Sequence, residues 1–202
     1  MEPIEKLIPE HHSGIQTNTE SSVQGNNEIQ AIDLFNKIKS RLLNINSWHQ
    51  FAGAASADFQ LTDENGSEVG RPAQKGDYFK INIPGPKSNT GEGNDWVRIE
   101  DIEEISKKNL EYIAIRVRPA SNPQNNHKDV AHFFSEEATS SFVVCRDGQN
   151  ITAGVYGRNE KPNTETENVI DKIRNTAVAA GAISGFSKLQ WKSLVNGLTD
   201  VK

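Results

Sequence analysis

The feature that most constrains the fold is a set of short segments in which apolar and polar side chains alternate. In DYFKINIP every second residue from Phe79 to Ile83 is apolar, and in EYIAIRVRP the same holds from Ile113 to Val117. A period of two places successive side chains on opposite faces of a strand. The pattern predicts an antiparallel sheet with one dry face and one wet face, so that another element must cover the dry face.

Turn-forming residues separate these segments from one another. ENGS follows the first segment and DGQN lies between the last two, as expected for strands that are joined by hairpins. We therefore expect about six strands, in ADFQLTD, DYFKINIP, DWVRIEDI, EYIAIRVRP, SFVVCR and ITAGVYG.

Helical patterns lie on both sides of the strands. Asn27 and Gln30 resemble a capping pair, and an apolar stripe with spacings of three and four follows from Ile32 to Leu42. Near the C-terminus, residues 164–186 combine a capping box with an Ala-rich apolar run, and residues 187–199 carry a second, shorter stripe. We expect the long helix within 164–186 to cover the dry face.

The N-terminal segment has a different composition. Residues 10–27 are mostly Ser, Thr, Asn, Gln, Gly and Glu. Such a segment buries too little apolar surface to offset the entropy lost on ordering. The sequence predicts a flexible polar tail over 1–27 and a single α+β domain over 28–202.

Composition excludes several classes of protein. The formal net charge of −5 and the lack of a Lys/Arg cluster argue against a nucleic-acid partner. No apolar run approaches the roughly 20 residues of a membrane span, and the N-terminus does not resemble an export signal. Cys145 is the only cysteine, which excludes an internal disulfide and agrees with a cytoplasmic location.

The segment 85–93 (GPKSNTGEG) has the composition of a phosphate-binding loop. Such a loop requires a following helix whose N-terminus faces the anion, whereas NDWVRIE continues here as a strand. We therefore interpret residues 85–93 as a long hairpin connection, with a lid over a pocket as a secondary role.

The order of the expected elements resembles the helix-grip superfamily (SRPBCC), which includes START, polyketide-cyclase and birch-allergen-like proteins. The matching segments are IQAIDLFNKIKSRLLNINSWHQFAG, the hairpins of 57–156 and TETENVIDKIRNTAVAAGAISGF, which would be the gripped helix. The family also has a strand before the early helix, which only a segment near 15–24 could supply, and the helix at 187–199 is additional. A curved antiparallel sheet packed on a long C-terminal helix is the expected fold, with an NTF2-like cone as the alternative.

The resemblance implies a hydrophobic cavity between the sheet and the C-terminal helix, which would take a lipid-like or aromatic small molecule. It implies no catalytic residues. The residues expected to contact a ligand there are Trp48, His49, Phe51, Phe79, Ile81, Trp96, Phe142 and Tyr156.

Other side chains have a simpler interpretation than a role in chemistry. His127 and His132 are five residues apart, whereas a helical two-histidine metal site needs a spacing of four, so we expect neither a metal nor a cofactor. Cys145 has no activating neighbour in the sequence. Arg116 and Arg118 should pair with Glu100 on the wet face; if the dry face is assigned wrongly, they would instead bind an anionic head group in the cavity.

Three hypotheses of function follow. The first is a protein that binds an apolar or amphipathic small molecule without transforming it. The second is a cyclase- or hydratase-like enzyme in the same cavity, using His49, Asp58 or Asp77. The third is a protein-interaction module without a pocket, in which 187–202 and the N-terminal tail make contacts in a homo-oligomer, with an exposed patch around Trp191.

Overall fold

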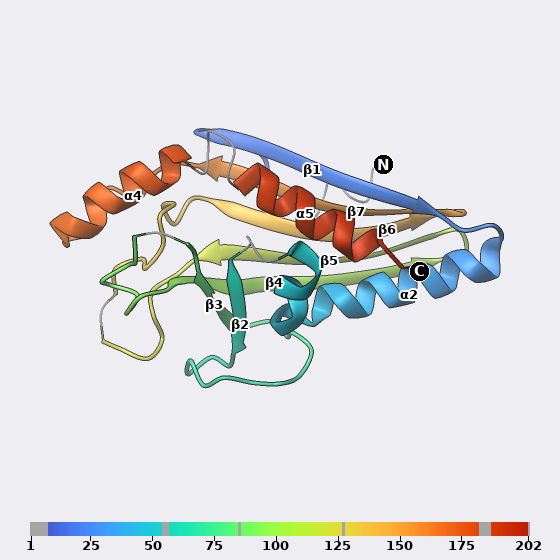
Figure 1. The fold of residues 1–202 in the computed structure, drawn as a ribbon, viewed down its shortest axis with the longest axis horizontal. Coiled ribbons are helices and arrows are strands. Elements are labelled where there is room, and N and C mark those ends of the chain that lie inside the picture. The colour runs from blue at the N-terminus through green and yellow to red at the C-terminus, as the bar shows by residue number, and fades with distance from the viewer. Residues whose placement is uncertain (1–7, 54–56, 85, 127, 182–186, 202) are drawn as a thin grey trace.

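The computed structural model describes residues 8–53, 57–84, 86–126, 128–181 and 187–201 (Figure 1). The first half of the chain forms β1 (Ile15–Gln24), α2 (Glu28–Leu43), the 3₁₀ turn η1 (Ile45–Ser47), α3 (Trp48–Ala52), β2 (Asp58–Thr62) and β3 (Tyr78–Asn82). The second half forms β4 (Asp95–Lys107), β5 (Leu110–Pro119), β6 (Thr139–Asp147), β7 (Asn150–Glu160), α4 (Val169–Gly181) and α5 (Ser187–Thr199).

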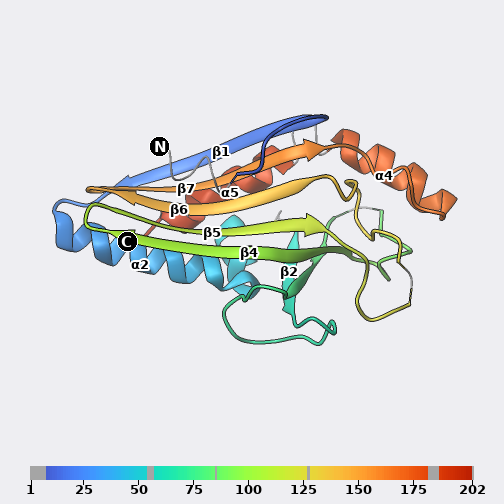
Figure 2. The same ribbon diagram turned by 180° about the vertical axis from the view of Figure 1, so that it is seen from behind.

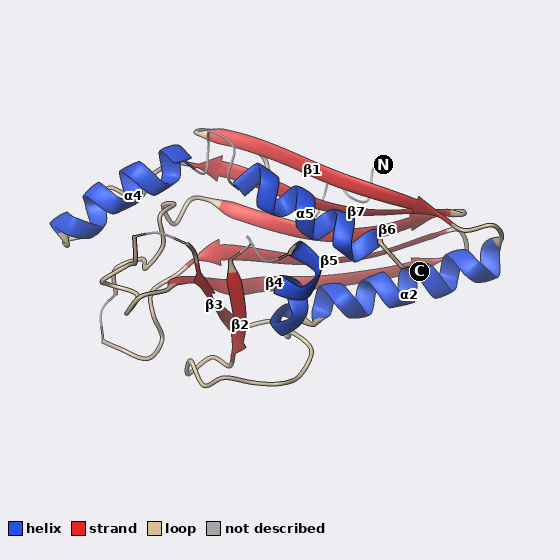
Figure 3. Cartoon of the chain, in the orientation of Figure 1, coloured by secondary structure: helices blue, strands red, loops and turns tan. Residues whose placement is uncertain are grey.

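The described residues form one antiparallel sheet of seven strands in the order β1-β7-β6-β5-β4-β3-β2. Strands β2 to β7 are neighbours in chain order, and β1 closes the far edge by pairing with β7. Helices α2, α3 and α5 lie on one side of this sheet (Figure 3), and the view from behind shows the strands in front of them (Figure 2). The fold is α+β with a helix-grip arrangement, and the NTF2-like alternative is not adopted.

Strand β1 corrects the expectation of a flexible tail over residues 1–27. The polar segment Ile15–Gln24 pairs with β7 from Ile15↔Glu160 to Gln24↔Asn150. Composition misled here because an edge strand is held by backbone hydrogen bonds, which need no apolar side chain. The family's early strand is therefore present near 15–24, as the resemblance required.

The first helix begins where the capping pair predicts. The Asn27 side chain accepts a hydrogen bond from the Gln30 amide (2.9 Å), and the Gln30 side chain accepts one from the Asn26 amide (2.6 Å). This pair of bonds satisfies amides that the first helical turn leaves without partners. The apolar stripe of α2 is buried in the core at Phe35, Ile38 and other positions.

The dry face of the sheet carries the main core. Trp48 lies at its centre, with ring centroids 5.3 Å from Phe59 and 4.7 Å from Phe142, and its indole N–H donates to the Leu42 carbonyl (3.0 Å). Trp191 of α5 adds an edge-on contact with Phe142 at 5.3 Å. These aromatic contacts join α3, α5 and the sheet in one packed layer.

The helix that covers the sheet is α5, which corrects the assignment of 164–186 as the gripped helix. Leu194, Val195 and Leu198 of α5 are at most 1 % exposed, and the Arg41 guanidinium of α2 donates to three carbonyls at the end of α5. Helix α4 extends past the ends of the strands in Figure 1. On α4, Ile170 and Ile173 are 66 % and 68 % exposed. Helical periodicity identifies an apolar stripe on each helix, but it does not show which of the two helices packs on the sheet.

The wet face is the face that the alternation predicts. Arg116 and Arg118 both pair with Glu100 there, and side chains of these residues are 27–36 % exposed. These guanidinium groups lie outside the cavity. The same face carries a small apolar cluster that contains Tyr112, Cys145 and Tyr156, onto which Ile8 packs. Residues 4 and 7, the other apolar residues near the N-terminus, lie outside the described residues.

The assignment of α5 as the covering helix leads to a first prediction. Leu194→Ala removes a fully buried side chain and is expected to lower the free energy of unfolding by about 2–5 kcal/mol. Ile173→Ala, on the exposed stripe of α4, is the matched control and should change it by less than about 0.5 kcal/mol. Urea unfolding followed by circular dichroism measures both; a larger loss for the Ile173 variant would contradict the assignment.

Candidate functional site: a cavity between the sheet and the C-terminal helices

The described residues line a partly open cavity of about 310 Å³ on the inner face of the sheet. The sheet supplies one wall, and α4, α5, the β3–β4 loop and the segment 132–134 supply the others. The apolar lining consists of Phe79, Ile81, Ile83, Pro84, Pro86, Val97, Val117, Phe133, Phe134, Phe142, Ala177, Val178, Gly181 and Trp191. An apolar pocket of this size is typical of a small-molecule site.

Four side chains with polar groups interrupt the apolar lining. These are His132, Ser140, Glu160 and Gln190. His132, Glu160 and Gln190 are at most 9 % exposed. Polar groups buried in an apolar wall fix the orientation of a bound molecule, because each one costs free energy when it is left without a partner.

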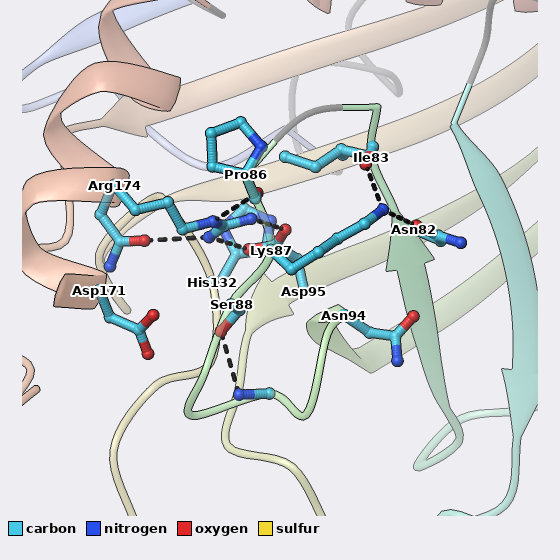
Figure 4. Close-up of polar contacts among 12 residues, drawn as sticks. Asn82, Ile83, Pro86, Lys87, Ser88, Asn94, Asp95, His132, Asp171 and Arg174 are labelled. Atoms are coloured by element: carbon cyan, nitrogen blue, oxygen red, sulfur yellow. Dashed lines mark hydrogen bonds and ion pairs between the residues drawn. The ribbon is translucent and has the colours of Figure 1, made fainter.

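A buried ion pair joins α4 to the start of β4, next to the β3–β4 loop. The Arg174 guanidinium donates to both carboxylate oxygens of Asp95, at 3.0 and 2.6 Å, and also to the Pro86 carbonyl at 3.0 Å (Figure 4). The side chains of Arg174 and Asp95 are 3 % and 1 % exposed. Because Pro86 lines the cavity, this pair holds the loop and α4 in place as two of its walls.

The β3–β4 loop binds a carboxylate of the protein itself, that of Asp171. The carboxylate of Asp171 on α4 accepts hydrogen bonds from the amides of Asn89 and Thr90, at 2.8 and 2.7 Å, and from the Thr90 hydroxyl at 2.6 Å. Asp171 is 2 % exposed. Residues 86–93 therefore lie in the connection between two strands, as expected, and the amides of Asn89 and Thr90 are occupied by this side chain.

His132 is held in one orientation by its neighbours. Its Nδ1 accepts a hydrogen bond from the Phe134 amide (2.9 Å), and its ring stacks on Phe133 with centroids 4.3 Å apart. Burial lowers the pKa of His132 from 6.5 to about 4, with Arg174 acting in the same direction and Asp95 against it. At neutral pH the ring is uncharged. Because Nδ1 accepts a hydrogen bond, Nε2 carries the proton and can donate a hydrogen bond to a ligand.

Glu160 reaches the inner face through a break in the strand alternation. Between Thr17↔Gly157 and Ile15↔Glu160, strand β7 has one residue more than β1, and Asn159 takes a left-handed conformation with φ 56°. Such a bulge moves the next side chain to the opposite face. A Cβ at Gly157 would collide with Oε1 of Glu160, so the carboxyl group occupies the space that this glycine leaves.

The surroundings of Glu160 favour its protonated form. Burial raises the pKa of Glu160 from 4.5 to about 7, whereas the Thr17 hydroxyl and Arg158 act in the opposite direction. A carboxyl group with this pKa exchanges a proton at neutral pH. Sequence reasoning missed Glu160 because strict alternation places residue 160 on the outer face with Tyr156.

The structure brings together three of the eight residues expected to contact a ligand. Phe79 and Ile81 of β3 and Phe142 of β6 line the cavity. Phe79 and Ile81 belong to the inner face that the alternation predicted.

The other five lie elsewhere. Trp48 is fully buried in the aromatic core, and Phe51 contacts the Arg41 guanidinium at 4.9 Å from its ring centroid. His49 is exposed to solvent. The two remaining residues are on the other side of the sheet: the Trp96 indole N–H donates to the Gly91 carbonyl (3.2 Å), and the Tyr156 hydroxyl donates to Glu20 (2.7 Å).

The other candidate residues lie outside the cavity. Asp58 is exposed, and Asp77 accepts two hydrogen bonds from Arg71, at 2.6 and 2.8 Å. Cys145 is buried in the outer-face cluster, where burial raises the pKa of its thiol. Residue 127, the second histidine of the considered pair, lies outside the described residues. Within the described ranges, no group of three or more His, Cys, Asp or Glu residues is placed to hold a metal ion.

Comparison with known proteins finds relatives at the level of fold. No protein-family model and no curated protein matches the chain. A hypothetical protein from Helicobacter pylori has a similar structure, with a TM-score of 0.54 and 14 % identity over 96 % of this chain and 91 % of that chain.

Two plant proteins are more distant matches. Major latex-like protein 151 from Panax ginseng has a TM-score of 0.39 and 12 % identity, over 84 % of this chain and 96 % of that one. Truncated norcoclaurine synthase from Thalictrum flavum has a TM-score of 0.36 and 9 % identity, over 88 % of this chain and 99 % of that one. At these identities the likeness concerns the fold alone. The chain has the helix-grip fold, and no helix within its described ranges is long and apolar enough to cross a membrane.

The ion pair behind the cavity wall gives a second prediction. Asp95→Asn leaves the Arg174 guanidinium buried without its counter-ion and should cost about 3–5 kcal/mol of unfolding free energy. Asp101→Asn removes one partner of the Lys75–Asp101 pair, in which Lys75 is 67 % exposed, and should cost less than about 1 kcal/mol. Chemical denaturation of both variants provides the test. Equal losses would show that burial adds nothing to the Asp95 interaction.

The raised pKa of Glu160 gives a third prediction, on stability against pH. Between pH 4.5 and about 7 the folded protein keeps a proton that the unfolded chain releases, so Glu160 stabilises the fold below this window and loses that contribution as pH rises through it. Glu160→Gln cannot ionise. The unfolding free energy of this variant, relative to that of the unsubstituted protein, should therefore rise by on the order of 3 kcal/mol as the pH is raised from 4 to 8. Urea denaturation at a series of pH values measures this difference; a difference independent of pH would rule out a buried ionising carboxyl.

Proposed function

We propose that this protein binds an apolar or amphipathic small molecule in the cavity between the sheet and helices α4 and α5. The observation that carries the proposal is the cavity of about 310 Å³, whose lining is apolar except for His132, Ser140, Glu160 and Gln190. Burial of a ligand's apolar body against such a wall contributes roughly 25 cal/mol for each Å² removed from water. The polar side chains would orient its head group.

The interaction-module hypothesis has less support. It required a core filled by side chains and an exposed patch around Trp191. Trp191 is instead half-buried and lines the cavity. The cytoplasmic location and the homo-oligomer expected from the sequence stay predictions.

An acid–base enzyme in the same cavity is the second candidate function, and Glu160 is the observation that favours it. A carboxyl group with a pKa of about 7 is poised to donate and accept protons at neutral pH. This role would replace the sequence-based candidates His49, Asp58 and Asp77, none of which lines the cavity.

Native mass spectrometry, before and after denaturation and organic extraction, tests the binding function. The purified protein is expected to carry a small molecule that is lost on unfolding. Ala177→Trp places an indole on α4 at the cavity wall and should abolish this adduct by filling the space.

Ala180→Trp is the matched control, because residue 180 is exposed on the same helix and does not line the cavity. This variant should keep the adduct. A bare mass for the unsubstituted protein, together with failure of apolar probes to bind, would overturn the proposal.

A further inference from the structure

We propose that the cavity selects a molecule with a primary amine on an apolar body, and that the carboxylate of Glu160 binds this amine. The inference rests on the proposed binding function and specifies the chemical class of its ligand. It is argued from the position of the Glu160 carboxyl group, from its partners and from the charges around it.

The position of the carboxyl group is set by the backbone. The bulge at Asn159 turns Glu160 to the inner face, where the side chain lies over Gly157 and is 4 % exposed. Ser140, the residue opposite Gly157 on β6, also lines the cavity. A carboxyl group is thus built into the polar end of an otherwise apolar wall.

The partners of this carboxyl group leave most of its hydrogen-bonding capacity unused. A carboxylate can accept about four hydrogen bonds, and the Thr17 hydroxyl supplies one to Glu160. Arg158, the nearest cation along β7, donates instead to the carbonyls of Thr17 and Gly157 and to the Asn18 side chain, at 3.1, 2.7 and 2.8 Å. Among the described residues no cation forms an ion pair with Glu160.

Among the described residues that line the cavity with Glu160, none carries a positive charge at neutral pH, and Lys161, the next residue along the chain, is paired with Glu137. Helix α5 presents the neutral Gln190, and α4 presents Ala177, Val178 and Gly181. His132 is uncharged at neutral pH, and Arg174 is committed to Asp95. A buried carboxylate without a counter-ion binds a cation strongly and repels an anion. An ammonium group on the ligand would supply the missing counter-ion, with its three donors satisfying the free oxygen positions.

Four naphthalene compounds with the same apolar body test the inference by isothermal titration calorimetry. They are 2-(2-naphthyl)ethylamine, 2-(2-naphthyl)ethanol, 2-naphthylacetic acid and 2-ethylnaphthalene. At pH 8 the amine should bind at least about tenfold more tightly than the alcohol, and the acid more weakly than the alcohol. If none of the four binds, both the proposed function and the inference fail. If all bind with similar affinity, the function stands and the amine selectivity is overturned.

A pH series on the unsubstituted protein gives an independent measurement. The amine stays protonated throughout, so its affinity follows ionisation of Glu160, whose pKa is about 7. Between pH 8 and pH 6 the affinity for the amine should fall about tenfold, while that for the alcohol stays constant. Parallel profiles for the two compounds would overturn the inference without any variant being needed.

Two variants test whether the preference for the amine, and its pH dependence, come from the Glu160 carboxyl group. Glu160→Gln should reduce the affinity for the amine to that of the alcohol and remove its pH dependence. Glu137→Gln makes the same change in net charge at an exposed position, whose side chain is 60 % exposed, and should keep the preference for the amine. Loss of the preference in both variants would point to overall charge and would contradict a specific role for Glu160.

Discussion

The buried ion pair between Arg174 and Asp95 is the interaction on which the candidate site depends. It joins α4 to the start of β4 and to the loop that precedes it. Asp171 adds a second connection, because its carboxylate takes up the amides of Asn89 and Thr90. These polar contacts bury one side of α4, while the apolar residues Val169, Ile170 and Ile173 of the same helix stay exposed. Two walls of the cavity are therefore held by charge and hydrogen bonds, whereas α3 and α5 are joined to the sheet mainly by apolar packing.

Helices α2, α3 and α5 pack closely in the apolar core, and the cavity lies where α4 instead forms part of the wall. Helix α5 packs closely through Leu194 and Leu198, and with α3 it completes an aromatic core around Trp48. Helix α4 contributes Ala177, Val178 and Gly181 to the cavity wall, none of which is a large side chain. Small side chains cannot fill the space above Phe79 and Phe142 as large ones would. A continuous helix with bulky residues would close this space and leave no site.

Much of the sheet could be predicted from alternation, but the composition of the cavity wall could not. The pattern places Phe79 and Ile81 on the inner face, and the structure puts them in the cavity lining. The same kind of reasoning also selected Trp48, which the structure buries in the packed core. An inward apolar side chain contacts either another side chain or an open space, depending on the position of the helices. That position is set by tertiary contacts and cannot be inferred from a short stretch of sequence.

The sequence by itself determined the strand segments, the two faces of the sheet and the start of α2, because periodicity and capping act over a few residues. Tertiary structure decided the role of Ile15–Gln24, whose pairing depends on the backbone of β7, and the choice of α5 over α4 as the covering helix. It also decided the position of Glu160, because a bulge and one left-handed residue reversed the alternation at the end of β7. Strand pairing and apolar packing set these features, and each needs partners that are far apart along the chain.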